Sequence, residues 1–236
     1  TTALKLDASQ NVLVGPTTSN AYGGAYPKVE VEDVDSTASI SVFRNSNDAN
    51  GPSIRLGSSR GTSVGSDTIV QDDDHLGAIY FAAADGTDRG SVGGEISCFI
   101  DGTPGVNDVP TRMQFGTTAD GANAPTYRMT ILQGGNIGVG TVNPTTKFQV
   151  YGDYITQTDG TRTTYYGSDG TGSMLGTSTN HYLRFITNNT ERMKISADGT
   201  QLLLGTGMDL EFAGEASVLD FHIGPSGNDY NHLHYD

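Results

Sequence analysis

One pattern occurs three times in the sequence: an alternating apolar segment, a short polar turn, a second alternating segment and a closing glycine. The three copies span residues 4–15, 129–140 and 193–205, and the last copy is one residue longer than the others. Period-two alternation on both sides of a turn is typical of a β-hairpin. A hairpin with one apolar face cannot bury that face by itself. Its recurrence therefore predicts a structure built by stacking similar units or by joining neighbouring chains.

The composition points in the same direction. Glycine supplies 32 of the 236 residues, tryptophan is absent, and the apolar residues with tyrosine included reach only 35%. A compact domain of this length buries about 70–75% of its unfolded surface, and this chain is short of apolar material to do so. Regular alternation and a charged content of 17% argue against disorder. We therefore expect a chain that folds and that obtains the missing apolar area from other copies of itself.

The charge excludes several classes of partner. The formal net charge is −14, and the 13 Lys and Arg residues are scattered, so neither nucleic acid nor an anionic membrane is an expected partner. No run of eighteen apolar residues occurs, and the first residues show no basic segment followed by an apolar core, so neither membrane insertion nor an export signal is expected. Cys98 is the only cysteine, which rules out an intrachain disulfide and predicts a small apolar side chain on a strand.

Most of the remaining chain also alternates with period two. Further strands are expected at residues 29–32, 40–43, 53–56, 78–81, 96–100 and 112–115. Gly, Asn or Asp fills nearly every gap between them. The sequence therefore predicts an all-β fold in three parts: an N-terminal hairpin at 1–19, a first β module at 20–143, and a second β module with C-terminal strands at 144–236.

Several segments resemble a known family. Residues 191–199 (ERMKISADG) and residues 127–150, which contain NIGVGTVNPTTKFQV, are similar to the "ERMRI-SSGNVGIGT-NP-KL-V" signature of tailed-bacteriophage tail fibres and related trimeric adhesins. Three further segments are similar to the part that precedes that signature: 76–86, 101–108 and 112–121. The resemblance covers about residues 70–200, and no self-cleaving Ser-Lys domain is recognisable after it.

The resemblance implies an elongated, intertwined, parallel homotrimer made of β-hairpin and β-sandwich-like modules. Three apolar faces related by rotation would close a core that one chain leaves open, and would remove exposed sheet edges. The alternative is that the same side chains fill the interior of an ordinary monomeric sandwich. The candidate trimer-core residues are the paired apolar positions of the second and third hairpins: Met129, Ile131, Ile137, Val139, Met193, Ile195, Leu202 and Leu204.

A His-x-His motif lies near the end of the sequence. His232 and His234 are two residues apart, so on a strand both imidazoles project from one face. On a three-fold axis they would form an octahedral site suited to iron, nickel or a similar ion, and some trimeric phage fibres use His-x-His in this way. The alternative is a polar terminal strand with Leu233 facing the core. No other cofactor is expected.

No catalytic residues are predicted. The acidic run at residues 72–74 is expected to be a solvated turn, and Asp85, Asp88 and Asp101 are expected to belong to turns. Three histidines have no Ser or Cys at a recognisable nucleophile elbow: His75, His181 and His222. The glycine-rich residues 134–140 lack the Gly-Lys-Ser/Thr ending of a phosphate-binding loop.

The resemblance implies a structural protein of a phage virion: a tail fibre that acts as shaft or as receptor-binding adhesin in host attachment, made in the host cytoplasm. Its partners would be other copies of itself, other virion proteins in the tail, baseplate or capsid, and a host glycan, with three weak sites giving avidity. A capsid-attached head fibre and a virion polysaccharide depolymerase are the alternatives. Tyrosines that could stack on sugars, or could instead be packing residues, are Tyr165, Tyr166, Tyr230 and Tyr235.

Overall fold

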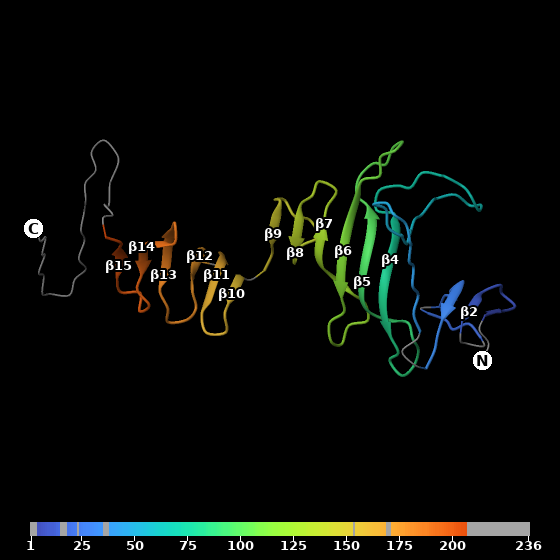
Figure 1. Ribbon diagram of the computed structural model, residues 1–236, viewed down its shortest axis with the longest axis horizontal. Coiled ribbons are helices and arrows are strands. Elements are labelled where there is room, and N and C mark those ends of the chain that lie inside the picture. The colour runs from blue at the N-terminus through green and yellow to red at the C-terminus, as the bar shows by residue number, and fades with distance from the viewer. Residues whose placement is uncertain are drawn as a thin grey trace, which may run out of the picture. The chain divides into compact units, whose positions relative to one another are not determined.

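The regular structure of this chain is entirely β. A computed structural model describes residues 4–14, 18–22, 24–34, 38–152, 154–168 and 171–206, and over these residues it contains fifteen strands and no helix. The prediction of an all-β fold is therefore confirmed. The chain divides into two units, Thr1–Tyr154 and Ile155–Asp236, and Figure 1 labels β2 and β4 to β15 among their strands. The three-part division expected from the sequence stays a prediction.

The first unit contains two sheets. One has three strands: β1 (Lys5–Leu6), β2 (Val12–Val14) and β3 (Val29–Val31). The other has six strands in sequence order: β4 (His75–Ala83), β5 (Ser91–Ile100), β6 (Thr111–Thr117), β7 (Thr126–Ile131), β8 (Ile137–Val139) and β9 (Phe148–Val150). The pairs β2–β3 and β8–β9 are parallel, and the other neighbours are antiparallel.

The second unit contains two three-stranded antiparallel sheets. The first is formed by β10 (Ile155–Thr158), β11 (Thr163–Ser168) and β12 (Ser173–Thr177). The other is formed by β13 (Leu183–Thr187), β14 (Thr190–Ile195) and β15 (Leu202–Leu204).

The three repeated segments all form hairpins, as predicted: β1–β2, β7–β8 and β14–β15. In the first two copies a parallel third strand follows, and a lysine at its start ties it to the hairpin turn. Lys28 Nζ donates to the Ser9 carbonyl at 2.9 Å, and Lys147 Nζ donates to the Gly134 carbonyl at 2.6 Å. The repeated unit is therefore larger than the sequence pattern indicates, because it includes the parallel strand.

The closing glycine of the second hairpin is required by its backbone. Gly140 has a φ of +76°, and its N–H donates to the Arg128 carbonyl at 2.9 Å. A Cβ at this position would collide with the Tyr151 carbonyl oxygen, because the chain returns there to form β9. At the end of the third hairpin, a Cβ on Gly205 would lie 3.0 Å from the Glu191 carbonyl oxygen. The glycine thus lets two backbone segments approach closely.

Residues 38–69 form an extended segment, here called the arm. The strands expected at residues 40–43 and 53–56 are wrong, because both stretches lie in the arm and have no strand partner. No backbone–backbone hydrogen bond joins residues 40–58 to another described residue. In Figure 1 the arm is the blue-to-cyan segment that precedes β4. Alternation alone therefore does not make a strand when no neighbour supplies a ladder.

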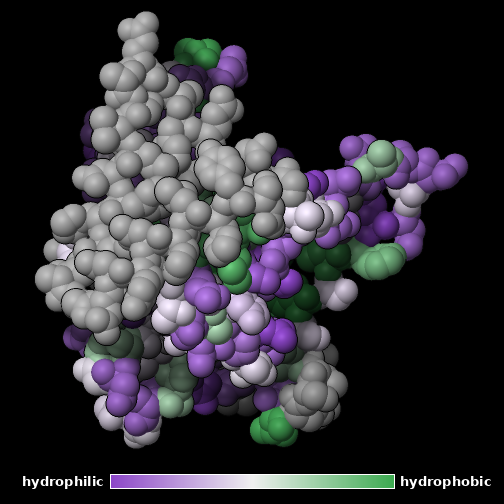
Figure 2. Space-filling model, turned by 90° about the vertical axis from the view of Figure 1, so that its left-hand side faces the viewer, coloured by the Kyte–Doolittle hydropathy of each residue, from purple (hydrophilic) through white to green (hydrophobic). Residues whose placement is uncertain are grey.

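The sheets in each unit are single layers. The described strands make their main contacts with neighbours in their own sheet, and within each unit no two sheets pack face to face. Among the described residues the only buried large apolar side chains are Leu13, Val70 and Ile100. Apolar groups reach the surface as green patches in Figure 2. A domain core normally needs two packed layers, and the described residues of this chain supply only one.

We predict that Gly140→Ala lowers stability by at least about 1–2 kcal/mol, because a Cβ disfavours the left-handed backbone conformation and also meets Tyr151. Gly134→Ala, in the turn of the same hairpin, is the control, since nothing lies within 4 Å of its added Cβ. Urea unfolding of the two variants measures the difference. Equal midpoints for both would contradict this account of the closing glycine.

Candidate self-association surface

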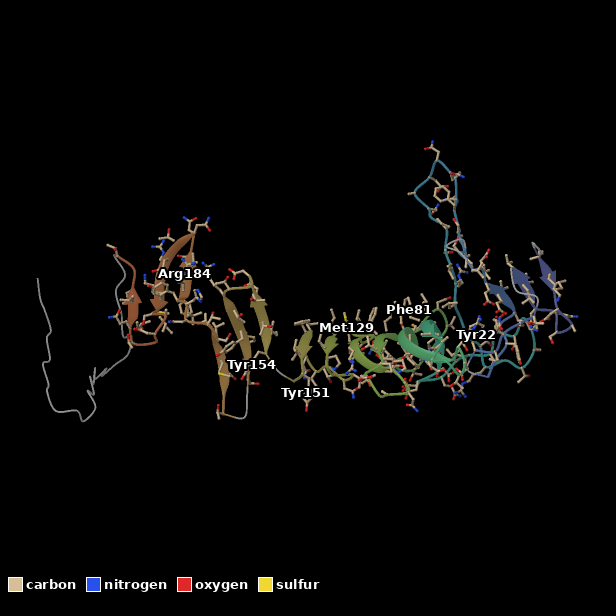
Figure 3. All side chains as sticks on the ribbon, turned by 90° about the horizontal axis from the view of Figure 1, so that it is seen from below. Tyr22, Phe81, Met129, Tyr151, Tyr154 and Arg184 are labelled. Atoms are coloured by element: carbon tan, nitrogen blue, oxygen red, sulfur yellow. The ribbon has the colours of Figure 1, made fainter. Side chains whose placement is uncertain are left out.

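One face of the six-stranded sheet is apolar from edge to edge. The strand registers align its side chains in rows that run across the sheet, for example Ile79, Ile96, Phe115, Met129 and Val139. The complete set, here called the apolar face, is Ile79, Phe81, Ile96, Cys98, Met113, Phe115, Met129, Ile131, Ile137, Val139, Phe148 and Val150. In Figure 3 the labelled side chains of Phe81 and Met129 lie on one side of this sheet and Tyr151 on the other.

The burial of the two faces is the reverse of what a stable isolated sheet requires. On the opposite, polar face, Ser97, Gln114 and Thr130 are 1%, 4% and 0% exposed. On the apolar face, the residues Ile79 and Phe81 are 53% and 61% exposed. Full burial of an Ile or Phe side chain contributes about 1.5–3 kcal/mol. The apolar face thus represents stabilisation that the described residues leave unused.

Loops anchored by Arg112 cover part of the polar face. Its guanidinium contacts Asp73 at 2.8 Å and Asp101 at 3.7 Å, donates to the Ile100 carbonyl at 3.0 Å, and lies 4.9 Å from the centre of the Phe99 ring. The side chain of Arg112 is only 18% exposed. This network explains how polar residues come to be buried beneath loops while the apolar face stays open.

A groove of about 560 Å³ adjoins this network. Its lining is Asp72, Asp73, Asp101, Gly102, Arg112, Gln114, Tyr127, Leu132, Val142 and Asn143. Burial, and then the neighbouring Glu95 carboxylate, raise the pKa of Tyr127. The carboxylates of Asp73 and Asp101 pair with Arg112. We therefore interpret these two groove residues as contacts that hold the loops together.

The acidic residues 72–74 and the histidines His75 and His181 were expected to have no catalytic role. In the structure, Asp72, Asp74 and both histidines have structural partners. Asp72 Oδ1 accepts from the Gly102 N–H at 2.7 Å, and Asp74 forms two hydrogen bonds with Arg60, at 2.7 and 2.6 Å. The His75 ring lies 4.7 Å from the Phe99 ring, and His181 Nδ1 lies 3.1 Å from the Thr179 hydroxyl. Among the described residues no group of three or more His, Cys, Asp or Glu side chains could hold a metal ion.

Each sheet of the second unit also has an exposed apolar row. In the sheet β10–β12, Ile155, Tyr166 and Leu175 are aligned and are 45%, 62% and 53% exposed. Tyr165, the neighbour of Tyr166, points to the opposite face, where its ring lies beside Gly176. The two tyrosines proposed as glycan contacts therefore do not form one surface.

The sheet β13–β15 places the predicted core residues of the third hairpin on one face. Met193 pairs with Leu204 and with Phe185, and Ile195 pairs with Leu202 and with Leu183. Of these, Leu202 is the most exposed, at 61%. The opposite face carries charged groups, where Lys194 Nζ lies 2.9 Å from the Glu191 carboxylate.

The structure thus places all eight candidate core residues on apolar sheet faces: Met129, Ile131, Ile137, Val139, Met193, Ile195, Leu202 and Leu204. Whether other copies cover them stays a prediction. Further members of the same faces were not among the core residues predicted from the sequence: Ile79, Phe81, Ile96, Met113, Phe115, Phe148, Val150, Leu183 and Phe185. Their period-two spacing was a usable signal, but the strand registers were needed to align them.

Several candidate residues lie outside the described part of the chain: Tyr230, His232, Leu233, His234 and Tyr235, together with His222. The proposed metal site and two of the four glycan-contact candidates therefore stay predictions.

Comparisons with known proteins give a distant likeness to a solved structure. No family model and no curated protein matches the chain. Among solved structures, the carboxy-terminal domain of the bacteriophage T5 L-shaped tail fibre is similar, with a TM-score of 0.38 and 8% identity over 82% of this chain and 100% of that chain. A likeness at this level carries no inference about what the chain does. In the described residues, no helix has the length and apolar character needed to span a membrane.

We predict that Ile79→Lys weakens self-association by more than about 100-fold, because a buried, unpaired ammonium costs several kcal/mol. Tyr80→Lys is the matched control. The two residues are neighbours on β4, are 53% and 54% exposed, and point to opposite faces. Light scattering over a dilution series measures association of both variants. Equal association constants would contradict the assignment of the apolar face as the interface.

We predict a pH dependence at the base of the arm. The Arg60 guanidinium, and then the Gln71 N–H, lower the pKa of Asp74 to about 2. Because the folded pKa lies below the unfolded value, the stabilisation is fully present above about pH 4 and is lost as the pH falls toward 2.

Carboxyl ¹³C NMR should therefore show Asp74 titrating near pH 2, and Arg60→Gln should move its midpoint toward the ordinary range. A wild-type midpoint near 3.8, the reference pKa of Asp, would show that the ion pair does not form in solution.

Proposed function

We propose that this chain is a structural module of a bacteriophage virion fibre, in which three copies assemble side by side through their apolar faces. The fibre is proposed to be a tail fibre, acting as a shaft or as a receptor-binding adhesin during host attachment. Its partners are two further copies of itself and the virion proteins to which the fibre is joined.

One observation supports this proposal most strongly: the described residues form single-layer sheets whose apolar side they leave largely uncovered. Of the described apolar side chains, those at the centre of the faces, such as Ile96, Met129 and Ile137, are only half-buried. An ordinary monomeric sandwich would place them between two sheets, and within each unit no second sheet lies against them. Other copies of the chain would supply the missing layer.

The number three comes from the sequence resemblance together with a geometric argument. Residues 127–150 and 191–199 resemble the signature of trimeric fibres. A rotational arrangement of identical chains closes on itself, whereas a non-closing arrangement of sticky faces produces open polymers. A closed ring of three also brings the apolar faces toward one axis, where water is excluded. The acidic chain, with a net charge of −14, keeps the outside of such assemblies soluble.

Two finer features belong to the same proposal. His232 and His234 of three copies would bind an axial iron or similar ion, because six imidazoles suit octahedral coordination. Elemental analysis of the purified assembly tests this metal site, and the absence of stoichiometric metal would contradict it. The candidates for stacking on a host glycan are Tyr165 and Tyr166, which are described, and Tyr230 and Tyr235. Tyr166 is available for this only where its apolar row is not covered by another copy.

We predict that antibodies against this protein label the tail fibres of phage particles in negative-stain electron microscopy. Label at the capsid would instead assign the chain to a head fibre, and label nowhere on the particle would contradict a virion role altogether.

Incubation of the purified assembly with host polysaccharide separates binding from degradation, since a fibre retains the glycan intact and a depolymerase releases oligosaccharides.

A further inference from the structure

The arm carries apolar side chains that its own unit does not bury. Ile40 and Val42 alternate on one limb, Ile54 and Leu56 alternate on the other, and Phe43 lies near the tip. Ile40, Phe43 and Ile54 are 72%, 83% and 77% exposed. This is the alternation of a half-buried strand, on a segment whose residues 40–58 have no backbone partner among the described residues.

Ion pairs hold the arm at its tip and at its base. At the tip, Arg44 Nη1 lies 2.6 Å from Asp48 Oδ1 and donates to the Asn50 carbonyl at 2.7 Å. At the base, Arg60 forms its two hydrogen bonds with Asp74, immediately before β4. The tip contacts close the turn of the arm on itself and the base contacts anchor it before β4, so the arm loses less conformational entropy on binding than a loop without such contacts does.

The base of the arm lies on the apolar face. The Leu56 side chain packs over Gly77, where an added Cβ would be only 2.9 Å from Leu56 Cβ. Gly77 pairs with Cys98, which pairs with Met113. Leu56 therefore occupies the first position of a row whose other members stay uncovered. In Figure 3 the arm stands out from the sheet on the side where Phe81 and Met129 lie.

The length and charge of the arm suit a second copy of this chain. The eight residues from Leu56 to the tip at Asp48 reach up to about 26 Å when extended, and six strands at a spacing of about 4.8 Å are about 24 Å wide. The arm, residues 38–69, carries three Arg and two Asp, whereas the whole chain has a net charge of −14. The weakly basic arm is therefore attracted to an acidic copy of the same protein.

We propose that the arm is exchanged between copies, so that residues 40–54 of one chain lie on the apolar face of its neighbour, while Leu56 stays on the face of its own sheet. The inference rests on the self-association proposed above and names the segment that makes the contact. Each copy then both gives and receives an arm, and the side chains of Ile40, Val42, Phe43 and Ile54 supply the second layer that the sheet lacks.

Cys98 allows a direct test, because the only cysteine of the chain lies on the apolar face. A chain with Phe43→Cys in a Cys98→Ser background is co-expressed with a differently tagged wild-type chain, and the mixed assembly is treated with a short bismaleimide. An exchanged arm gives a cross-linked product that contains both tags. Ile54→Cys in the same background is the second variant, and Val106→Cys, on a loop residue that is 94% exposed, is the control.

We expect at least about tenfold more product with both tags from the arm variants than from the control, because exchange raises the effective concentration of the two thiols toward the millimolar range. Peptide mapping should then join the arm to the segment that contains Cys98. If the assembly forms but the arm variants give no more product than the control, the exchange is wrong while self-association stands. If all chains are monomeric in the same sample, the proposed function fails as well.

Discussion

A sheet with one apolar side is not stable in water as a single layer, and this constraint governs the whole chain. The six-stranded sheet and both sheets of the second unit have an apolar row or face, and among the described residues of each unit no other sheet packs against it. In the largest sheet the chain uses its own loops to cover the polar side, through Arg112 and its contacts with Asp73 and Asp101. The apolar side is left for something else. Hydrophobic burial is the dominant favourable contribution to folding and to association, so the state in which that side is covered is the one we expect to exist.

The repeated unit shows how a modest sequence makes many such layers. A hairpin followed by a parallel third strand that is tied by a lysine occurs twice in the first unit, and in the second of these copies Gly140 permits close backbone approach. The bond from Lys147 to the Gly134 carbonyl and its counterpart from Lys28 to Ser9 use one side chain to hold a turn and a strand together. Buried hydrophobic area is scarce in this chain, so backbone ladders and such polar ties keep the layer in shape, while the apolar face remains free to select a partner.

The sequence predicted the strands, the hairpins and one side of the second and third hairpins, because alternation with period two determines which residues share a face. It did not show that β3 pairs in parallel with β2, or that β9 pairs in parallel with β8, since these pairings depend on the lysine contacts and on the path of the connections. It also placed strands at residues 40–43 and 53–56, where the structure has the arm. Period-two alternation indicates that one side of a segment is suited to packing against an apolar surface. It does not indicate whether that surface belongs to the same chain or to another copy. The same limit explains why the uncovered state of Ile79 and Phe81 was not apparent before the registers were known.

The mass of the folded protein at high dilution tests this account most directly. Sedimentation at submicromolar concentration, with circular dichroism on the same sample, should give a β-folded species of three times the 24.8 kDa chain mass. The trimer should persist on dilution, and where it dissociates, the β-sheet signal in circular dichroism should be lost at the same concentration. A stably folded particle of 24.8 kDa would contradict the account, because it would mean that the apolar faces need no other copy to cover them.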